Sequence, residues 1–330
     1  MKIAIVHNAV PPGAGPDERD VLVQVDSVTG ALCALGHEPW PLPVTLDLAL
    51  FARQLGRLEP ALVFNLVESL DGSGRLIHVV PSLLDRMRVP FTGCPTVALF
   101  VTTDKILSKE IMRAAGLPTP GWVTAAGLAA GDPPPDLPCI VKPVGEDASV
   151  GVDERSLVTG AADLAGALAE MEASYGDAFA ESYVNGREFN LSILAGPAGP
   201  EVLPPAEIVF EGYPEGKPRV VGYRAKWDEG SFEYSHTVRS FDFAGADSPL
   251  VDSLRALALR CWDLFGLRGY ARVDFRADHS GAPWILEVNA NPCISPDAGF
   301  VAAAGRAGLG FEGVVERIVG DLRRRLPRED

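Results

Sequence analysis

The stretch YARVDFRADHSGAPWILEVNA, residues 270–290, contains two alternating runs rich in β-branched and aromatic residues. A polar turn that includes Ser280-Gly281 separates the two runs. Alternation on both sides of a short glycine-containing turn is typical of two antiparallel strands, so the stretch predicts a β-hairpin.

Four polar side chains alternate along this predicted hairpin. Side chains two residues apart on a strand share one face of the sheet. Arg272 and Asp274 therefore point to one side of the first strand, and Glu287 and Asn289 point together from the second. If the register places both pairs on the same side, one cation and three oxygen ligands converge, a set that suits Mg²⁺ completed by substrate phosphates. The alternative is a solvated hairpin face whose charges have no common task.

The overall composition fits a globular enzyme. The chain has 330 residues, of which 47% are hydrophobic and 22% are charged, and this length favours two or three domains that share a cleft. No apolar run approaches the length of a membrane-spanning helix, so we expect no membrane partner. The five cysteines are widely spaced and lack a CxxC pair, which fits a reducing compartment and predicts a cytoplasmic protein.

The charge balance is strongly acidic, with a formal net charge of −15. Surfaces that bind nucleic acid are basic, so we expect no nucleic-acid partner. Only six of the 29 Lys and Arg residues are lysines. A compact ammonium group suits phosphate as a point charge, so each lysine in this arginine-rich chain is a candidate for a specific role. The six are Lys2, Lys105, Lys109, Lys142, Lys217 and Lys226.

Hydrophobic patterns predict alternating strands and helices, as in an α/β protein. Predicted strands cover residues 2–7, 62–66, 139–143, 178–183 and 189–194, in addition to the hairpin. Predicted helices cover residues 20–35, 106–115, 161–175, 249–265 and 311–326. A long loop with four glycines over residues 210–235 predicts a mobile lid.

Further short motifs precede the hairpin along the chain. They are Asp17-Glu18-Arg19-Asp20, Thr103-Asp104-Lys105, Ile140-Val141-Lys142-Pro143 with Ala148-Ser149-Val150-Gly151, Glu181-Ser182-Tyr183-Val184 with Gly186-Arg187-Glu188-Phe189, and Tyr223-Arg224-Ala225-Lys226. With the hairpin, and in this order, they make the chain resemble the D-alanine–D-alanine ligase branch of the ATP-grasp superfamily over nearly its whole length. Each motif is weak alone, and the shared order carries the resemblance.

The resemblance implies a three-domain ATP-grasp fold of the α/β class, with α+β character in its C-terminal parts. The implied ranges are residues 1–96 for an N-terminal Rossmann-like domain, 97–186 for a central ATP-grasp subdomain and 187–330 for a C-terminal subdomain with the metal ligands. The nucleotide would lie in a cleft between the central and C-terminal domains.

The resemblance also implies an ATP site. Lys105 and Lys142 would reach the nucleotide phosphates from two sides of the cleft. The remaining contacts would come from Glu181 to the adenine amino group, the backbone of Tyr183 and Val184 to the ring, and Glu188 to the ribose hydroxyls.

The hairpin and the lid would supply the metal site and the catalytic groups of such an enzyme. Asp274, Glu287 and Asn289 would hold two Mg²⁺ ions, for which Mn²⁺ can substitute, against the β and γ phosphates. Arg272 would stabilise negative charge on the transferring phosphoryl group and on the tetrahedral oxyanion. Lys226 would close over the γ phosphate and exclude water.

Other candidate residues have competing interpretations. Glu18 would pair with the ammonium group of the first substrate, or it serves only as a favourable charge at a helix start. Ser149 would place its amide and hydroxyl beside phosphate, or it caps a turn. Glu188 could instead be a surface acid at a strand edge. Lys109, four residues after Lys105, is expected to be solvated and not catalytic.

The amino-acid end departs from the family pattern. Cys293 replaces a glycine, and Ala298 falls near the expected serine. Asp297 in an acceptor pocket would repel a carboxylate and favour an ammonium group. Ala148 stands where a substrate-side serine is usual, and the segment before Glu68 lacks the histidine that often precedes it.

These features predict an ATP- and Mg²⁺-dependent carboxylate–amine ligase that joins amino-acid or small-peptide substrates through an acyl phosphate. Three alternatives stay open: a true D-alanine–D-alanine ligase of cell-wall synthesis, a catalytically idle nucleotide-binding or regulatory protein, and a kinase that forms no amide. Family habit suggests a homodimer, although no residue indicates it.

Overall fold

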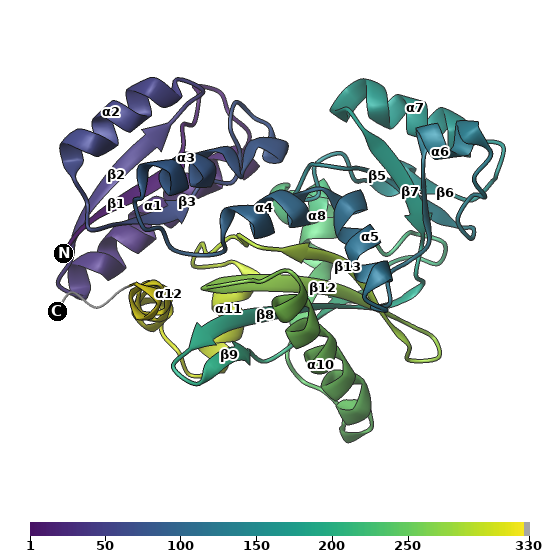
Figure 1. The fold of residues 1–330 in the computed structure, drawn as a ribbon. Coiled ribbons are helices and arrows are strands. Elements are labelled where there is room, and N and C mark those ends of the chain that lie inside the picture. Colours follow the sequence, from purple (N-terminus) through teal and green to yellow (C-terminus); the bar gives the residue numbers. More distant parts are fainter. Residues whose placement is uncertain (327–330) are drawn as a thin grey trace.

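Three separate sheets organise the fold, as seen in a computed structural model that describes residues 1–326. The last four residues of the predicted range 187–330 lie outside the described part. Figure 1 shows the first sheet at upper left, the second at upper right and the third below them. Within residues 1–326, none of the helices combines the length and the apolar character needed to cross a lipid bilayer.

The first sheet is parallel, has the strand order β2-β1-β3 and is the expected Rossmann-like unit. Parallel neighbours need crossover connections, which α1 and α2 supply. The edge strand β2 tolerates Pro39, Pro41 and Pro43 because the N–H groups of the alternate residues, starting with Glu38, face β1. The elements are β1 (Lys2–Asn8), α1 (Pro16–Ala34), β2 (Glu38–Val44), α2 (Leu48–Leu58), β3 (Leu62–Leu66) and α3 (Val79–Met87).

The second sheet is antiparallel, with the order β4-β7-β5-β6. Helix α7 covers it with Leu164, Leu168 and Met171, whose spacing of four and three residues places them on one face of the helix. The elements are β4 (Trp122–Thr124), α6 (Ala125–Ala130), β5 (Cys139–Pro143), β6 (Leu157–Val158), α7 (Leu164–Tyr175) and β7 (Ala178–Ser182).

The third sheet is antiparallel and has the order β11-β10-β8-β12-β13, with β9 also paired to β8. Three helices share an apolar core with it: α4 (Thr96–Thr103), α5 (Lys105–Ala114) and α10 (Ser248–Leu264). Helices α4 and α5 fall almost wholly in the range predicted for the central subdomain, yet they pack on the third sheet. The three domain ranges therefore stay a proposal. The strands are β8 (Gly186–Gly196), β9 (Gly199–Val202), β10 (Ala206–Phe210), β11 (Thr237–Ser240), β12 (Tyr270–Asp278) and β13 (Pro283–Asn289).

The predicted hairpin is confirmed as β12 and β13. Its register places Arg272 opposite Asn289 and Asp274 opposite Glu287, so the four polar residues form two directly facing pairs. A shift in register follows Asp274, as expected where an inserted residue re-aims a side chain.

The segment predicted as a lid contains two short helices that the sequence patterns missed, α8 (Tyr223–Trp227) and α9 (Phe232–His236). The Tyr223 hydroxyl donates to Asp17 in the first turn of α1 at 2.8 Å. Trp227 Nε1 donates to the carbonyl of Ala148 at 3.1 Å. The segment therefore bridges the first sheet unit and the loop after β5.

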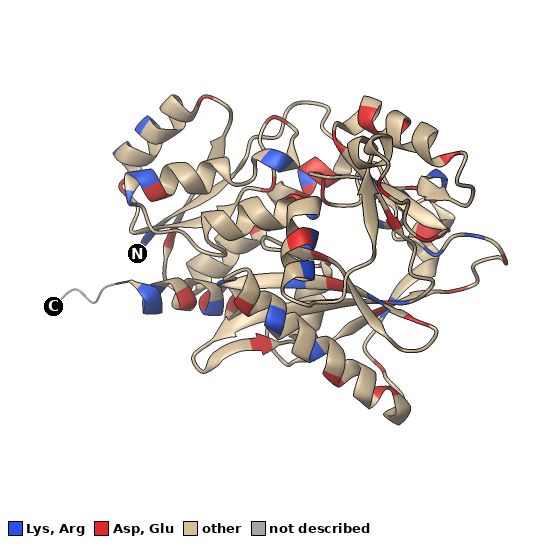
Figure 2. Ribbon diagram, turned by 45° about the vertical axis from the view of Figure 1, so that its right-hand side comes forward, with Lys and Arg blue, Asp and Glu red and all other residues tan. Residues whose placement is uncertain are grey.

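Helix α12 (Phe311–Arg325) packs on α1 in the first sheet unit (Figure 1). Acidic and basic positions are interspersed along the ribbon, and a basic stretch marks the end of α12 (Figure 2). The remaining elements are α11 (Gly299–Arg306) and three 3₁₀ turns, Gly74–Leu76, Glu154–Ser156 and Gly245–Asp247.

Candidate active site

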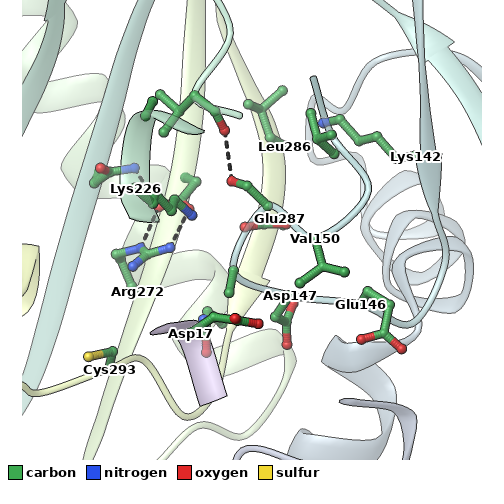
Figure 3. Close-up of a pocket in the computed structure, with 18 of the residues that line it drawn as sticks. Asp17, Lys142, Glu146, Asp147, Val150, Lys226, Arg272, Leu286, Glu287 and Cys293 are labelled. Carbon is green, nitrogen blue, oxygen red and sulfur yellow. Dashed lines mark hydrogen bonds and ion pairs between the residues drawn. The ribbon is translucent and has the colours of Figure 1, made fainter. Parts of the chain in front are cut away.

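A cavity of about 620 Å³ is lined by residues from all three sheet units and from the lid segment. In Figure 3, Lys142 and Cys293 lie at opposite ends of the part drawn, with Glu287 between them. The cavity brings together every residue predicted for the site: Glu18, Lys105, Lys142, Ser149, Glu181, Tyr183, Val184, Glu188, Lys226, Arg272, Asp274, Glu287 and Asn289.

Arg272 and Asp274 form a two-point ion pair on β12. Nε and Nη2 of Arg272 donate to Oδ1 and Oδ2 of Asp274, both at 2.8 Å. Asn190 on β8 donates to the same carboxylate at 2.8 Å. Burial raises the pKa of Asp274 even though the Arg272 guanidinium opposes this shift. Asn190 was not predicted as a site residue, because only the register of β8 with β12 shows that it faces Asp274.

Glu287 is an ionised carboxylate facing cations. Lys105 Nζ lies 3.7 Å from Glu287 Oε2 and 3.2 Å from Asp147 Oδ1. Burial alone would raise the pKa of Glu287, but nearby cations, first Lys105 and then Lys142, lower it to about 2. No side chain or backbone group within residues 1–326 donates a hydrogen bond to Glu287, so its oxygens are open to a ligand.

The carboxylate of Glu181 is held between two lysines. Lys142 Nζ lies 2.6 Å from Oε1, and Lys109 Nζ lies 2.6 Å from Oε2. The expectation that Lys109 is solvated is wrong: its side chain is 1% exposed, because α5 turns it inward toward Glu181 and Thr119. Burial lowers the pKa of Lys109. Burial opposes ionisation of Glu181, but the two ammonium groups prevail and lower its pKa.

Glu188 has an arginine partner. Arg276 donates from Nε and Nη2 to Glu188 Oε2 at 3.1 and 2.8 Å, and from Nη1 to the carbonyl of Val184 at 2.9 Å. Glu188 is 9% exposed, so the alternative of a surface acid is wrong. Arg276 was not predicted, although it follows Asp274 by two residues and the alternation of the strand could have indicated it.

The loop after β5 folds over the cavity and is fastened to the lid segment. Ala148 and Ser149 have φ angles of 56° and 63°, a left-handed conformation that is costly for residues other than glycine and often occurs at functional sites. The Ser149 hydroxyl donates to the carbonyl of Val221 at 2.7 Å. Lys226 also lines the cavity, and burial together with the charge of Arg272 lowers its pKa.

Carboxyl groups are concentrated at the other end of the cavity. Cys293 Sγ and Ser295 Oγ both donate to Asp20, at 2.9 and 2.8 Å. Glu18 also lines the cavity, in the first turn of α1. This position is compatible with both interpretations of Glu18, a ligand for an ammonium group and a charge that favours the helix start.

Glu68 provides a pH-dependent prediction at this end of the cavity. Burial raises its pKa from 4.5 to about 7, although Gln24 donates a hydrogen bond to it at 2.9 Å. Between these two pH values the folded state holds the proton more tightly than the unfolded state, so the free energy of unfolding falls as pH rises from about 4.5 to 7. We expect Glu68→Gln to remove this contribution.

Urea unfolding of both proteins at pH 5 and pH 8 measures this effect. The variant should gain stability relative to the wild type between the two pH values. An unchanged difference in the free energy of unfolding would show that Glu68 ionises normally in the folded protein.

The chain is similar to a family model, to curated relatives and to solved structures. A family model described as D-ala D-ala ligase C-terminus matches residues 129–320. An uncharacterized protein, y4sG, from Sinorhizobium fredii is 33% identical and covers 98% of each chain. A D-alanine–D-alanine ligase from Anaeromyxobacter dehalogenans is 32% identical over 94% of this chain and 95% of its own. A crystal structure of D-alanine–D-alanine ligase from Bacillus anthracis complexed with ATP superposes with a TM-score of 0.74 at 20% identity, covering 98% of both chains.

Proposed function

Because the chain belongs to the D-alanine–D-alanine ligase family and has the ATP-grasp fold, it is an ATP-dependent carboxylate–amine ligase, and we propose that its substrates are two amino-acid-like molecules. One molecule supplies the carboxylate and the other supplies the amine. One observation carries the proposal. Arg272 faces Asn289, and Asp274 faces Glu287, in a cavity that three lysines also line.

The nucleotide half of the proposal rests on the lysines and on β7. Lys105 on α5 and Lys142 on β5 both line the cavity, and they would hold the phosphates. Glu181 stays ionised between its two lysines and is thus suited to accept from the adenine amino group. The backbone of Tyr183 and Val184 would hold the ring, and Glu188, fixed by its arginine, would bind the ribose.

The hairpin oxygens fit Mg²⁺ that is shared with phosphate groups. Within residues 1–326, no three His, Cys, Asp or Glu side chains converge as a metal site of their own. Asp274 and Glu287 offer carboxylates and Asn289 an amide oxygen on adjacent strands, a sparse set that suits an ion which keeps water and phosphate ligands. When bound, two Mg²⁺ ions, or Mn²⁺ in their place, would neutralise charge on the β and γ phosphates.

The chain's own residues would then carry the two chemical steps. Arg272 stabilises the phosphoryl group as it passes to the first substrate's carboxylate, and afterwards the oxyanion formed when the amine attacks. Lys226 neutralises the γ phosphate, and the loop containing Ser149 excludes water that would hydrolyse the acyl phosphate. Glu18 would hold the ammonium group of the first substrate.

D-alanyl-D-alanine is a second candidate product, favoured by relatives named D-alanine–D-alanine ligase at 32% identity. Against it stand Cys293 and Ala298 at the amino-acid end, where both line the cavity. A homodimer and a cytoplasmic location stay predictions.

Phosphate release from Mg·ATP tests the proposal, with D- and L-amino acids offered singly and in pairs and products identified by mass. We expect release to require a pair and to yield one amide per ADP. D-alanine alone as both substrates would establish the second candidate. Phosphorylation of one substrate without amide formation would show a kinase and contradict the proposal.

A further inference from the structure

The ammonium group of Lys105 is surrounded by three oxygen atoms. Lys105 is the first residue of α5 and is 7% exposed. Its Nζ donates to the carbonyl oxygen of Glu146 at 2.6 Å and to Oδ1 of Asp147 at 3.2 Å, and it lies 3.7 Å from Oε2 of Glu287. An ammonium group has only three hydrogens to donate. A phosphate that Lys105 is to hold must therefore displace one of these oxygens.

The oxygen of Asp147 is the one that a phosphate can displace most easily. The Glu146 oxygen belongs to the backbone, in a segment that is also fixed by a hydrogen bond of 3.2 Å from the Lys105 N–H to the carbonyl of Val144. The Asp147 carboxylate is on a side chain that is 35% exposed. Within residues 1–326, Lys105 is the only side chain that pairs with it. Rotation of this one side chain therefore frees a donor of Lys105.

Asp147 competes with a phosphate in two ways. It occupies the cation, and it adds a negative charge to the wall of the cavity where the phosphates are proposed to lie. Like charges that share one site disfavour each other. When the state that can bind a ligand is only a fraction of the protein, the apparent affinity falls by that fraction. The ion pair with Asp147 should thus weaken nucleotide binding.

We propose that Asp147 makes an autoinhibitory contact: it neutralises Lys105 before a nucleotide binds, and an incoming phosphate group must displace it. This inference rests on the proposed function, in which Lys105 holds the nucleotide phosphates. The loop after β5 thereby carries its own competitor for the nucleotide. The same contact re-forms when the product leaves, so it weakens the binding of ATP and of ADP alike.

Nucleotide binding to the full-length enzyme, measured by calorimetry without amino acids, tests the inference. Asp147→Asn keeps the size of the side chain and removes its charge. We expect its Kd for Mg·ADP to be about 3- to 10-fold lower than that of the wild type. Its Kd for adenosine, which has no phosphate, should stay within about twofold of the wild-type value. An unchanged Kd for Mg·ADP would overturn the inference, and so would a higher one, which would show that Asp147 positions the loop for phosphate.

Glu146→Gln is the matched control. Glu146 precedes Asp147, also lines the cavity and removes the same charge when it is replaced (Figure 3). It meets Lys105 through its backbone carbonyl, whereas its carboxylate faces Gly74, where an added Cβ would lie 3.4 Å from Oε2. Its Kd for Mg·ADP should stay within about twofold of the wild-type value. Equal tightening in both variants would overturn the inference, because the cause would then be net charge. Failure of the proposed function is distinct, because it appears as the absence of an amide product when amino acids are added.

Discussion

Arg272→Ala and Asp274→Ala should each lower kcat by about 10²- to 10³-fold or more, the cost of removing a group that stabilises transition-state charge. Arg272 is the cation nearest the paired hairpin oxygens, and Asp274 fixes its guanidinium through two hydrogen bonds of 2.8 Å. Loss of Asp274 therefore also releases Arg272 from its position, and it removes one of the proposed Mg²⁺ ligands. Single-turnover and steady-state rates measure both effects.

Folding must be monitored separately, because Arg272→Ala leaves the buried Asp274 with Asn190 as its main donor. We expect urea unfolding to remain cooperative in both variants. Arg272→Lys keeps the charge without the planar fork, so it should retain more stability than Arg272→Ala while still losing most activity. Arg268→Ala, at an exposed position just before β12, is the control and should be near wild type in rate and stability. Near-normal rates in Arg272→Ala or Asp274→Ala would refute the mechanism.

The sequence was sufficient for the hairpin because a period of two residues specifies which side chains share a face. Only the register was missing, and the structure supplies it by pairing Asp274 with Glu287. The prediction that Lys109 is solvated was wrong for a different reason. Its spacing on a helix says nothing about Glu181, which is 72 residues away and meets it only when β7 is placed beside α5. A sequence pattern does not show that a side chain is buried when its partner is distant in sequence.

The same limit explains why the lid helices were missed. Each has five residues and lies in a segment rich in glycine, so intrinsic propensity is a poor guide to either. Their positions depend on tertiary contacts, such as those of Tyr223 with Asp17 and of Trp227 with Ala148.

The buried pair of Lys109 with Glu181 leads to the second large prediction, Lys109→Met. Both side chains are 1% exposed, and removing one partner of a buried pair typically costs about 3–5 kcal/mol because a charge is left uncompensated. Lys142 still contacts Glu181 at 2.6 Å, so we expect the lower end, about 3 kcal/mol in the free energy of unfolding. Urea unfolding measures it.

Two further variants separate charge from packing. Arg113→Ala, on the same helix and exposed over the Trp122 ring at 4.4 Å, should cost only about 0.5–1 kcal/mol. Lys109→Met combined with Glu181→Leu should recover much of the lost stability, because no buried charge is then left without a partner and Lys142, 17% exposed, can be hydrated. If the double variant is as unstable as Lys109→Met, the cost lies in packing around the lysine chain. If Lys109→Met costs no more than the control, no uncompensated charge is left in the variant, because Lys142 alone balances Glu181 or Glu181 takes up a proton.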